Sequence, residues 1–465
     1  MISGAESPIV ICRNRARANW RTNLCSSSDS LPEASLRSAI IMFISIRDAT
    51  ATSPAINANL PTLLISPPLT STIASSHASV NPGQHDIHSL YLAPRDGSYQ
   101  KNKKEIGMTK NIVDVFCKFV QIDSESGEEA KFISYLQDLF TSELNANCAL
   151  DKYGNLIARV PAKGSGKPEP LLLGAHADTV KPGKGIRPVI EGGVIRSAGE
   201  TILGADDKAG IAEIFEATRT ATKHPPLEIV ITRGEEVGLL GAKNLDISMV
   251  RAKMGFIIDG DDAATIVIGG PTHISLDIEV IGRAAHAGME PEKGISAILV
   301  AAQAISRIPL GRIDHETTAN VGTIHGGAIR NGIPERVKIQ AECRSLNDEK
   351  AMRQAETMRQ AFEQAAREAG AKVEITSEIE YRASRTSEDA PVVKIAQEAI
   401  RAVGLTPRIE VITGGTDALV LSGRGINAVV LGYGGSAAHT TSEQITQEAL
   451  EASTTVIKQI IENAA

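Results

Sequence analysis

Hydrophobic residues beyond Met108 fall into short apolar runs that alternate with amphipathic stretches. The apolar runs have the length of strands, whereas the stretches between them repeat their apolar positions with the period of a helix. Continuous apolar strands that alternate with helices indicate an α/β sheet covered on both faces. The predicted strands are 155–160, 170–178, 227–234, 255–260, 408–415 and 427–434, and the predicted helices are 111–122, 208–223, 390–404 and 442–464.

The middle of the chain, residues 271–385, follows a different order of elements. Its pattern reads strand, helix, strand, strand, helix, strand, which is typical of a ferredoxin-like α+β fold. We therefore predict a discontinuous α/β domain made of residues 108–270 and 386–465, with this second domain inserted into it. The inserted strands are expected at 273–282, 317–327, 337–346 and 372–383, and the helices at 294–308 and 350–369.

Residues 1–107 lack any sustained period and are rich in Ser, Pro and Thr, so little regular structure is expected there. An Arg/Ser-rich organelle transit segment is one interpretation. Glu6, Asp29 and Glu33 argue against it, because such segments are poor in acidic residues. We favour a disordered extension, or upstream sequence translated from a misassigned start with Met108 as the true initiator.

Composition excludes several classes of partner. The chain of 465 residues carries a formal net charge of −7 and 3% aromatic residues, so neither nucleic acid nor an anionic membrane is an expected partner. No apolar run approaches the ~20 residues that a membrane-spanning helix needs. The five cysteines are not clustered, which supports neither a thiolate zinc site nor a disulfide framework. A reducing, cytoplasmic setting is the expectation.

Candidate metal ligands begin at the end of the predicted strand 170–178, which carries His176 and Asp178. Open α/β sheets bind their ligands at the carboxyl ends of strands. Positions i and i+2 of a strand point the same way, so Asp178 could orient the imidazole of His176 on a metal ion. A structural pair at a strand end is the alternative interpretation.

Two acidic pairs follow along the chain. Asp206 and Asp207 precede the helix predicted at 208–223, where an aspartate could cap the helix or bridge two metal ions, and the nearby glycines permit close backbone approach. Glu235 and Glu236 follow another predicted strand. Adjacent residues of a strand point apart, so one could bind a metal while the other holds a water molecule. A solvated loop pair is the alternative.

The inventory is completed by Asp259, at the end of the strand predicted at 255–260, and by His439 in a glycine-rich loop. Alone, such a histidine would be a cap or a surface group. Together the residues offer two imidazoles and three carboxylates, which suits a pair of divalent ions and compensates the cost of burying the acids. Nitrogen and oxygen ligands without thiolate favour zinc, with cobalt or manganese as alternatives.

Five separated motifs resemble, in order and spacing, those of the di-zinc metallopeptidase family of peptidase T, aminoacylase and carboxypeptidase G. They are HAD (176–178), GADDKAG (204–210), GEEVG (234–238), IIDG (257–260) and the late His439. The resemblance runs from about Met108 to the C-terminus and is closest to peptidase T, also through GGTDA (414–418). It implies a zinc-peptidase (phosphorylase/hydrolase-like) catalytic domain with a central mixed sheet and an inserted ferredoxin-like lid or dimerisation domain.

The resemblance also implies how the metal ions are held. Asp206 would bridge both ions. A cis peptide bond would join Asp206 to Asp207. His176 and Asp259 would complete one site. Glu236 and His439 would complete the other.

Further roles are implied by the same family. Glu235 would be the general base for a metal-bridging water, whose pKa falls from 15.7 towards ~7 when metal-bound, and would return the proton to the leaving amine. Asp178 would orient the metal-bound histidine. His286 would reach the active site of the partner subunit in a homodimer formed through the inserted domain and stabilise the oxyanion, although a plain loop histidine is the alternative. Asn331 and Arg344 would bind the substrate.

The leading functional prediction is an aminopeptidase that cleaves short peptides, with tripeptides as the expected substrates. A deacylase or carboxypeptidase of the same family is the alternative, but that branch typically has Glu where this chain has Asp259. A catalytically silent binding or scaffold relative would be indicated by loss of Glu235 or a ligand, and all are present. A phosphate-binding protein is a poor fit, because the chain lacks a GxxxxGK[ST] motif.

Overall fold

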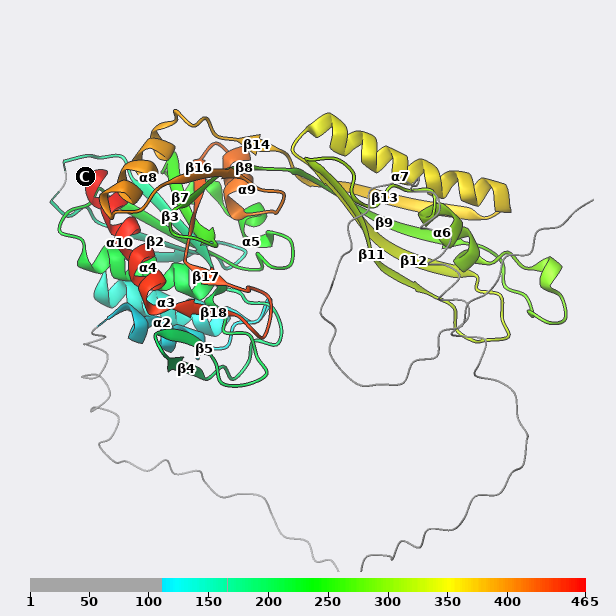
Figure 1. Cartoon of the computed structure of the whole chain (residues 1–465), viewed down its shortest axis with the longest axis horizontal. Helices are drawn as coiled ribbons and strands as arrows, with labels where there is room; N and C mark the ends of the chain where they lie inside the picture. The colour runs from blue at the N-terminus through cyan, green and yellow to red at the C-terminus, as the bar shows by residue number, and fades with distance from the viewer. Residues whose placement is uncertain (1–110, 165) are drawn as a thin grey trace, which may run out of the picture. The chain divides into compact units, whose positions relative to one another are not determined.

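The computed structural model describes residues 111–164 and 166–465, and Figure 1 shows how their helices and strands are arranged. The predictions for residues 1–107 and for Met108 as initiator lie outside this range. Strands within it form a nine-stranded, a five-stranded and a four-stranded sheet. Among the described helices, none combines the length and apolarity needed to cross a membrane.

The nine-stranded sheet is mixed, as expected. Its order is β1-β2-β6-β3-β7-β16-β8-β14, and β15 also pairs with β8. Strands β6, β3, β7 and β16 run parallel to one another at its centre. Every position of β3, β6 and β8 is buried, because helices cover both faces. The strands are β1 (Asn147–Leu150), β2 (Leu156–Val160), β3 (Leu171–His176), β6 (Leu227–Thr232), β7 (Met254–Gly260), β8 (Thr265–Gly270), β14 (Ser384–Arg385), β15 (Arg408–Val411) and β16 (Asn427–Gly432).

Separate groups of helices cover the two faces of this sheet. The larger hydrophobic cluster joins one face to α2 (Ile112–Val120), α3 (Ala130–Glu143), α4 (Ala205–Thr220), α8 (Pro391–Ala402) and α10 (Gln447–Asn463). On the other face, a smaller cluster includes residues of α9 (Asp417–Gly423), and residues of η3 (Ile247–Met249) pack against it. Helix α5 (Leu240–Asn244) contacts α9. The predicted α/β sheet with helices on both faces is therefore confirmed.

The five-stranded sheet is antiparallel and has the order β10-β11-β12-β9-β13. Helices α6 and α7 pack on one of its faces (Figure 1). The order of elements along the chain confirms the ferredoxin-like prediction. The elements are β9 (Thr272–Ile281), η4 (Pro291–Lys293), α6 (Ala297–Ile305), β10 (Gly311–Arg312), β11 (Thr317–Gly326), β12 (Arg336–Ser345), α7 (Asp348–Ala369) and β13 (Lys372–Tyr381).

We propose that the chain consists of the predicted catalytic and inserted domains. The separate nine-stranded and five-stranded sheets support this proposal. The inserted domain was predicted to end at residue 385. Strand β14 (Ser384–Arg385) already pairs with β8 of the nine-stranded sheet, so the chain returns to that sheet two residues earlier than predicted.

Several elements were not predicted, among them the 14-residue helix α3. Strand β8 was missed, as were α3, α5, α9 and the four-stranded sheet β17-β18-β5-β4. Strand β18 also occupies the start of the helix predicted at 442–464, which instead begins at Gln447 after the N-cap Thr446. The strands of the four-stranded sheet have two to four residues, too few to show a period, and they form through their pairing partners. The strands of this sheet are β4 (Pro188–Glu191), β5 (Val194–Ser197), β17 (Gly435–Ser436) and β18 (Gln444–Thr446).

Candidate metal centre

The five predicted metal ligands come from separate segments that meet near the carboxyl ends of the central parallel strands. His176 is the last residue of β3, and Asp259 lies near the end of β7. Asp206 lies at the start of α4, Glu236 in the turn after β6, and His439 in the loop between β17 and β18. Parallel strands place their carboxyl ends at one edge of a sheet, which is why segments so distant in sequence converge.

The carboxylate of Asp206 lies between the two imidazoles. Its Oδ1 is 3.0 Å from His176 Nε2, and its Oδ2 is 3.2 Å from His439 Nε2. His176 Nε2 is also 3.6 Å from Asp259 Oδ1, and His439 Nε2 is 3.0 Å from Glu236 Oε2. Each oxygen of one carboxylate therefore faces a different imidazole, and each imidazole has a further carboxylate beside it.

The beginning of α4 departs from helical geometry where these acids lie. Asp206 and Asp207 have non-helical dihedral angles and are joined by a cis peptide bond, as the resemblance implied. Asp207 Oδ2 accepts a hydrogen bond from the backbone N–H of His176 at 3.1 Å. A Cβ at Gly210 would lie 2.3 Å from both Asp207 Oδ1 and Ile258 O, so the expected close backbone approach occurs there.

Glu235 and Glu236 lie in a turn, not in a strand, so the strand argument for their opposite directions was wrong. Asp178 organises this turn. Its Oδ1 accepts from the N–H of Glu235 at 2.9 Å, and its Oδ2 accepts from the N–H of Glu236 at 3.2 Å and from Ser126 Oγ at 2.8 Å.

Asp178 also contacts His176, as predicted, but β3 ends before it, so the expected strand geometry does not apply. His176 Nδ1 lies 2.9 Å from the backbone oxygen of Asp178 and 3.5 Å from its Oδ1. The carbonyl is therefore the closer partner of the imidazole.

The electrostatics of the cluster fit a divalent metal centre. Burial and the neighbouring Asp259 raise the pKa of Glu235 well above its usual range, and burial and other carboxylates raise that of Asp259 to about 6. Burial also acts to raise the pKa of Asp206, but the two imidazoles outweigh it and lower that pKa. Glu236 Oε1 is buried without a hydrogen-bond partner. Buried carboxylates of this kind need positive charge nearby. Two sets of possible ligand atoms each lie within 4.8 Å of one another: those of His176, Asp206 and Glu236, and those of His176, Asp207 and Asp259.

His286 and Asn331, two of the three other predicted residues, line one hollow of about 710 Å³ in the ferredoxin-like region. Both are exposed, and the N–H of Ala287 donates to Asn331 O at 3.0 Å. His286 Nδ1 accepts from the N–H groups of Gly288 and Met289, so the other ring nitrogen is available.

Arg344 lies apart from these two, on β12. Its guanidinium pairs with Glu342 through Nε–Oε1 at 3.2 Å and Nη2–Oε2 at 3.0 Å. Among the hydrogen bonds and ion pairs of the described residues, none joins His286, Asn331 or Arg344 to the metal centre.

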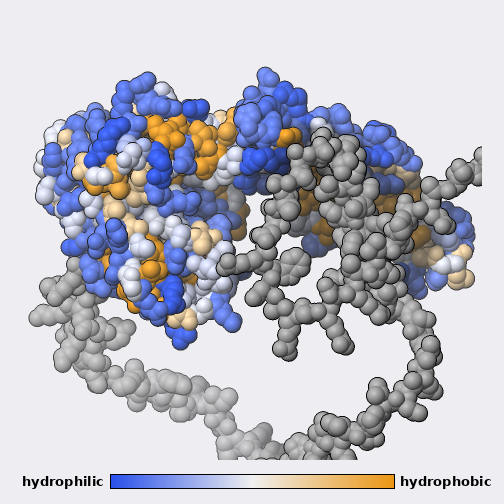
Figure 2. Space-filling view, in the orientation of Figure 1, coloured by the Kyte–Doolittle hydropathy of each residue, from blue (hydrophilic) through white to orange (hydrophobic). Residues whose placement is uncertain are grey.

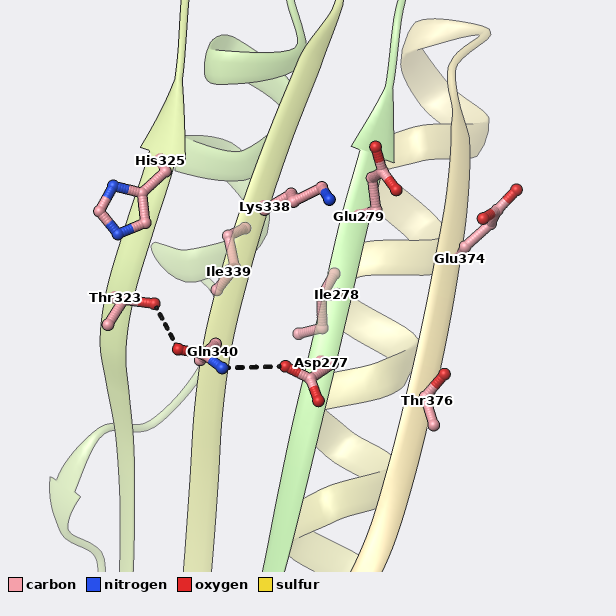
Figure 3. Close-up of a pocket in the computed structure, with 10 residues that line it drawn as sticks. All are labelled: Asp277, Ile278, Glu279, Thr323, His325, Lys338, Ile339, Gln340, Glu374 and Thr376. Atoms are coloured by element: carbon pink, nitrogen blue, oxygen red, sulfur yellow. Dashed lines mark hydrogen bonds between the residues drawn. The ribbon is translucent and has the colours of Figure 1, made fainter. Parts of the chain in front are cut away.

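A second hollow, of about 490 Å³, lies on the face of the five-stranded sheet opposite its helices (Figure 3). Thr323 Oγ1 donates to Gln340, whose amide donates to Asp277. Neither ligand group found in the described residues belongs to this hollow. It also contains no predicted site residue, so the candidate centre is the cluster around Asp206.

Polar residues that the sequence patterns did not indicate lie close to this cluster. Thr416 Oγ1 donates to Asp259 Oδ2 at 3.4 Å, and the buried Asp417 accepts from Thr232 Oγ1 at 2.5 Å. Both belong to the GGTDA motif (414–418), for which the resemblance implied no role. Glu443 accepts from the backbone N–H groups of Gly204 and Asp206. It falls within the helix predicted at 442–464, and nothing local in the sequence indicates these two contacts.

Two family descriptions match the chain. They are the peptidase dimerisation domain over residues 268–370 and peptidase family M28 over residues 155–265. The protein YqjE of Bacillus subtilis is 41% identical over 369 residues, which cover 77% of this chain and 99% of YqjE. A peptidase T of Desulfitobacterium hafniense is 32% identical over 277 residues, which cover 58% of this chain and 67% of that protein.

Two solved structures are similar over almost their whole length. The aminopeptidase PepT of Bacillus cereus has 40% identity and a TM-score of 0.69, covering 77% of this chain and 99% of that one. A tripeptidase of Staphylococcus aureus has 37% identity and a TM-score of 0.72, covering 76% and 97%. The chain therefore belongs to the metallopeptidase family of peptidase T.

Proposed function

We propose that this protein is a two-metal aminopeptidase that hydrolyses short peptides, with tripeptides as its preferred substrates. The observation that carries the proposal is the carboxylate of Asp206, whose two oxygens face different imidazoles at 3.0 and 3.2 Å. A single carboxylate shared in this way matches the bridging ligand of a co-catalytic metal pair. The relatives described above as an aminopeptidase and a tripeptidase supply the substrate class.

Five residues would hold the metal ions. Asp206 would bridge them, His176 and Asp259 would complete one site, and Glu236 and His439 the other. Imidazole and carboxylate ligands without thiolate favour zinc, while cobalt or manganese would also fit. When bound, such ions supply Lewis acidity towards the scissile carbonyl and acidify a water molecule.

Glu235 would act as the general base of the reaction. Its side chain is half-buried, burial and the charge of Asp259 raise the pKa of its carboxyl, and the turn that carries it is held by Asp178. It would take the proton of the attacking water and deliver it to the amine that leaves when the peptide bond breaks. Asp178 would serve as a positioning residue for this base and for His176.

Asn331 and Arg344 would bind the substrate. Arg344 presents a planar fork that suits a carboxylate, and this fork is now occupied by Glu342. A peptide carboxylate would therefore have to share or replace that partner.

His286 would act on the active site of a second copy. The molecule would then be a homodimer formed through the inserted domain, which matches the peptidase dimerisation domain. Large apolar side chains are exposed on this domain: Ile298 is 43%, Leu299 58% and Ile324 48% exposed. Figure 2 shows a mostly hydrophilic surface in which hydrophobic residues gather in separate patches. Burying the exposed apolar area against a second copy would favour association.

The enzyme would work in the cytoplasm. Cys117, Cys148 and Cys343 are free thiols in the described structure, as a reducing compartment requires. Fractionation of cells that produce the protein would test this placement.

The substrate proposal is tested by measuring the release of amino acids from matched di-, tri- and tetrapeptides and from N-acyl amino acids. An aminopeptidase should prefer the tripeptide and should not cleave the same tripeptide after N-acetylation. Faster hydrolysis of the N-acyl amino acids would favour the deacylase alternative. No hydrolysis of any of these by the metal-loaded protein would favour a binding or scaffold relative.

A further inference from the structure

Glu443 connects two loops that carry metal-ligand candidates. It lies four residues after His439, directly before β18, and is only 1% exposed. Its Oε2 accepts from the backbone N–H of Gly204 at 2.6 Å, and its Oε1 accepts from the N–H of Asp206 at 2.9 Å. One buried carboxylate thus joins the His439 loop to the segment that carries Asp206.

The His439 loop depends on such a connection. His439 and Ala437 have φ angles of 63° and 56°, a left-handed backbone conformation that residues other than glycine rarely adopt. The His439 side chain is 55% exposed, so little packing surrounds the ring. The position of the loop backbone therefore decides how closely the imidazole approaches Asp206 and Glu236.

We propose that Glu443 is a positioning residue that fixes the distance between His439 and Asp206 and thereby sets the affinity of the second metal site. The inference rests on the proposed function, because it concerns the site formed by Asp206, Glu236 and His439. Asp178 provides a parallel within the same centre. It holds the Glu235–Glu236 turn through the same type of contact, a buried carboxylate that accepts two backbone N–H groups.

The chemistry of the contact predicts which substitution removes it. Both oxygens of Glu443 accept, and each faces a different N–H donor. A glutamine has a similar shape but only one acceptor oxygen, and its NH₂ group would face the remaining N–H. Glu443→Gln therefore turns one of the two hydrogen bonds into a contact between donors.

The experiment titrates the metal-free full-length protein with Zn²⁺ in a competing chelator and records the visible spectrum after titration with Co²⁺. Wild type should bind two ions. Glu443→Gln should keep the first site and lose at least about tenfold in affinity at the second, the usual scale for partners that orient a ligand. Its Co²⁺ spectrum at one equivalent should match that of His439→Ala, in which the second site is removed. Activity lost by the variant should return at high Zn²⁺.

Glu228→Gln is the control for replacing a buried glutamate away from the metal centre. Glu228 is also 1% exposed and lies near the opposite end of β6; its Oε2 accepts from the N–H groups of Arg251 and Ala252 at 2.8 and 2.9 Å, and its Oε1 pairs with Arg251 Nε at 3.4 Å. This control should lower thermal stability without changing either metal affinity. Glu443→Asp keeps both acceptor oxygens on a shorter side chain and should lie between wild type and Glu443→Gln in second-site affinity.

The outcomes separate the inference from the proposed function. Wild-type protein that binds fewer than two ions contradicts the two-metal function itself. Two ions in wild type and equal affinities in Glu443→Gln overturn the role of Glu443. An equal loss at both sites also overturns it, since the effect would then be general. If Glu443→Gln does not fold, Glu443→Asp decides, and a second-site affinity equal to wild type overturns the inference.

Discussion

Asp178 holds Glu235 through the backbone: its Oδ1 accepts from the Glu235 N–H at 2.9 Å, while its Oδ2 accepts from the next N–H, that of Glu236, at 3.2 Å. The proposed base and a proposed ligand are thus fixed by one buried carboxylate. The same residue contacts His176 through its carbonyl oxygen. It therefore aligns three groups of the centre at once.

Replacing this carboxylate should impair catalysis more than folding. Asp178→Asn leaves one acceptor for two N–H donors, and we expect kcat to fall by roughly 10–100-fold at saturating metal. Steady-state kinetics with metal analysis checks this. Ser126→Ala is the control, because it removes only the hydroxyl donor to Oδ2 and should have a much smaller effect. Wild-type kcat in Asp178→Asn would contradict the positioning role.

The base and its neighbouring ligand should be separable by mutation. Glu235→Gln should keep its metal content and lose at least ~10²–10⁴ in kcat, the usual scale for a lost general base. Glu236→Gln, one residue further, should instead lose metal from one site. Metal analysis beside kinetics distinguishes the two. If Glu235→Gln lost metal together with activity, Glu235 would have to be reassigned as a ligand.

Activity should depend on two metal equivalents. Chelation should abolish turnover, and adding back two equivalents of Zn²⁺ should restore it, because the shared Asp206 carboxylate makes both sites part of one centre. Asp206→Asn should lower the metal affinity of both sites together, since each oxygen of the carboxylate faces a different imidazole. A stoichiometry of one ion in fully active enzyme would disprove the bridging role.

His286 should act on the partner subunit. Glu235→Gln and His286→Ala should each be nearly inactive alone, and mixing them with subunit exchange should restore activity. The mixed dimer contains one site with an intact Glu235 and a His286 from the other subunit. Repeating the mixture with Leu299→Glu in both chains should abolish recovery if the exposed apolar surface around α6 forms the interface. Lack of recovery while exchange is observed would place His286 in its own subunit's site.

Removing residues 1–107 should preserve folding and turnover. Every residue assigned to the centre lies between residues 111 and 465, and these residues contain the hydrophobic clusters of both larger sheets. Thermal unfolding and the tripeptide assay on the truncated chain check this. An insoluble or inactive truncation would show that the segment belongs to the fold.

Local patterns were enough for most of the fold and for the ligand inventory. The apolar runs predicted six of the nine strands of the α/β sheet, and the order of elements in the middle of the chain predicted β9, β11, β12 and β13 of the second sheet. His176, Asp259, His439 and the pairs Asp206–Asp207 and Glu235–Glu236 were proposed from their residue types and their places beside predicted strands or helices. The resemblance then chose Asp206 and Glu236 as the ligands within the two pairs. Parallel pairing then obliges these strand ends to share one edge of the sheet.

The contacts that position the ligands could only be decided by the tertiary structure. Glu443 meets the N–H of Asp206 across 237 residues of sequence, and Asp178 meets the N–H groups of Glu235 and Glu236 across 57 and 58 residues. Strand β18 forms where a helix was predicted, because it pairs with β5, and β5 lies far upstream in the chain. A periodic pattern records which face of an element is buried. It does not record which backbone N–H a distant carboxylate will meet, since that depends on how separate segments pack once both are folded.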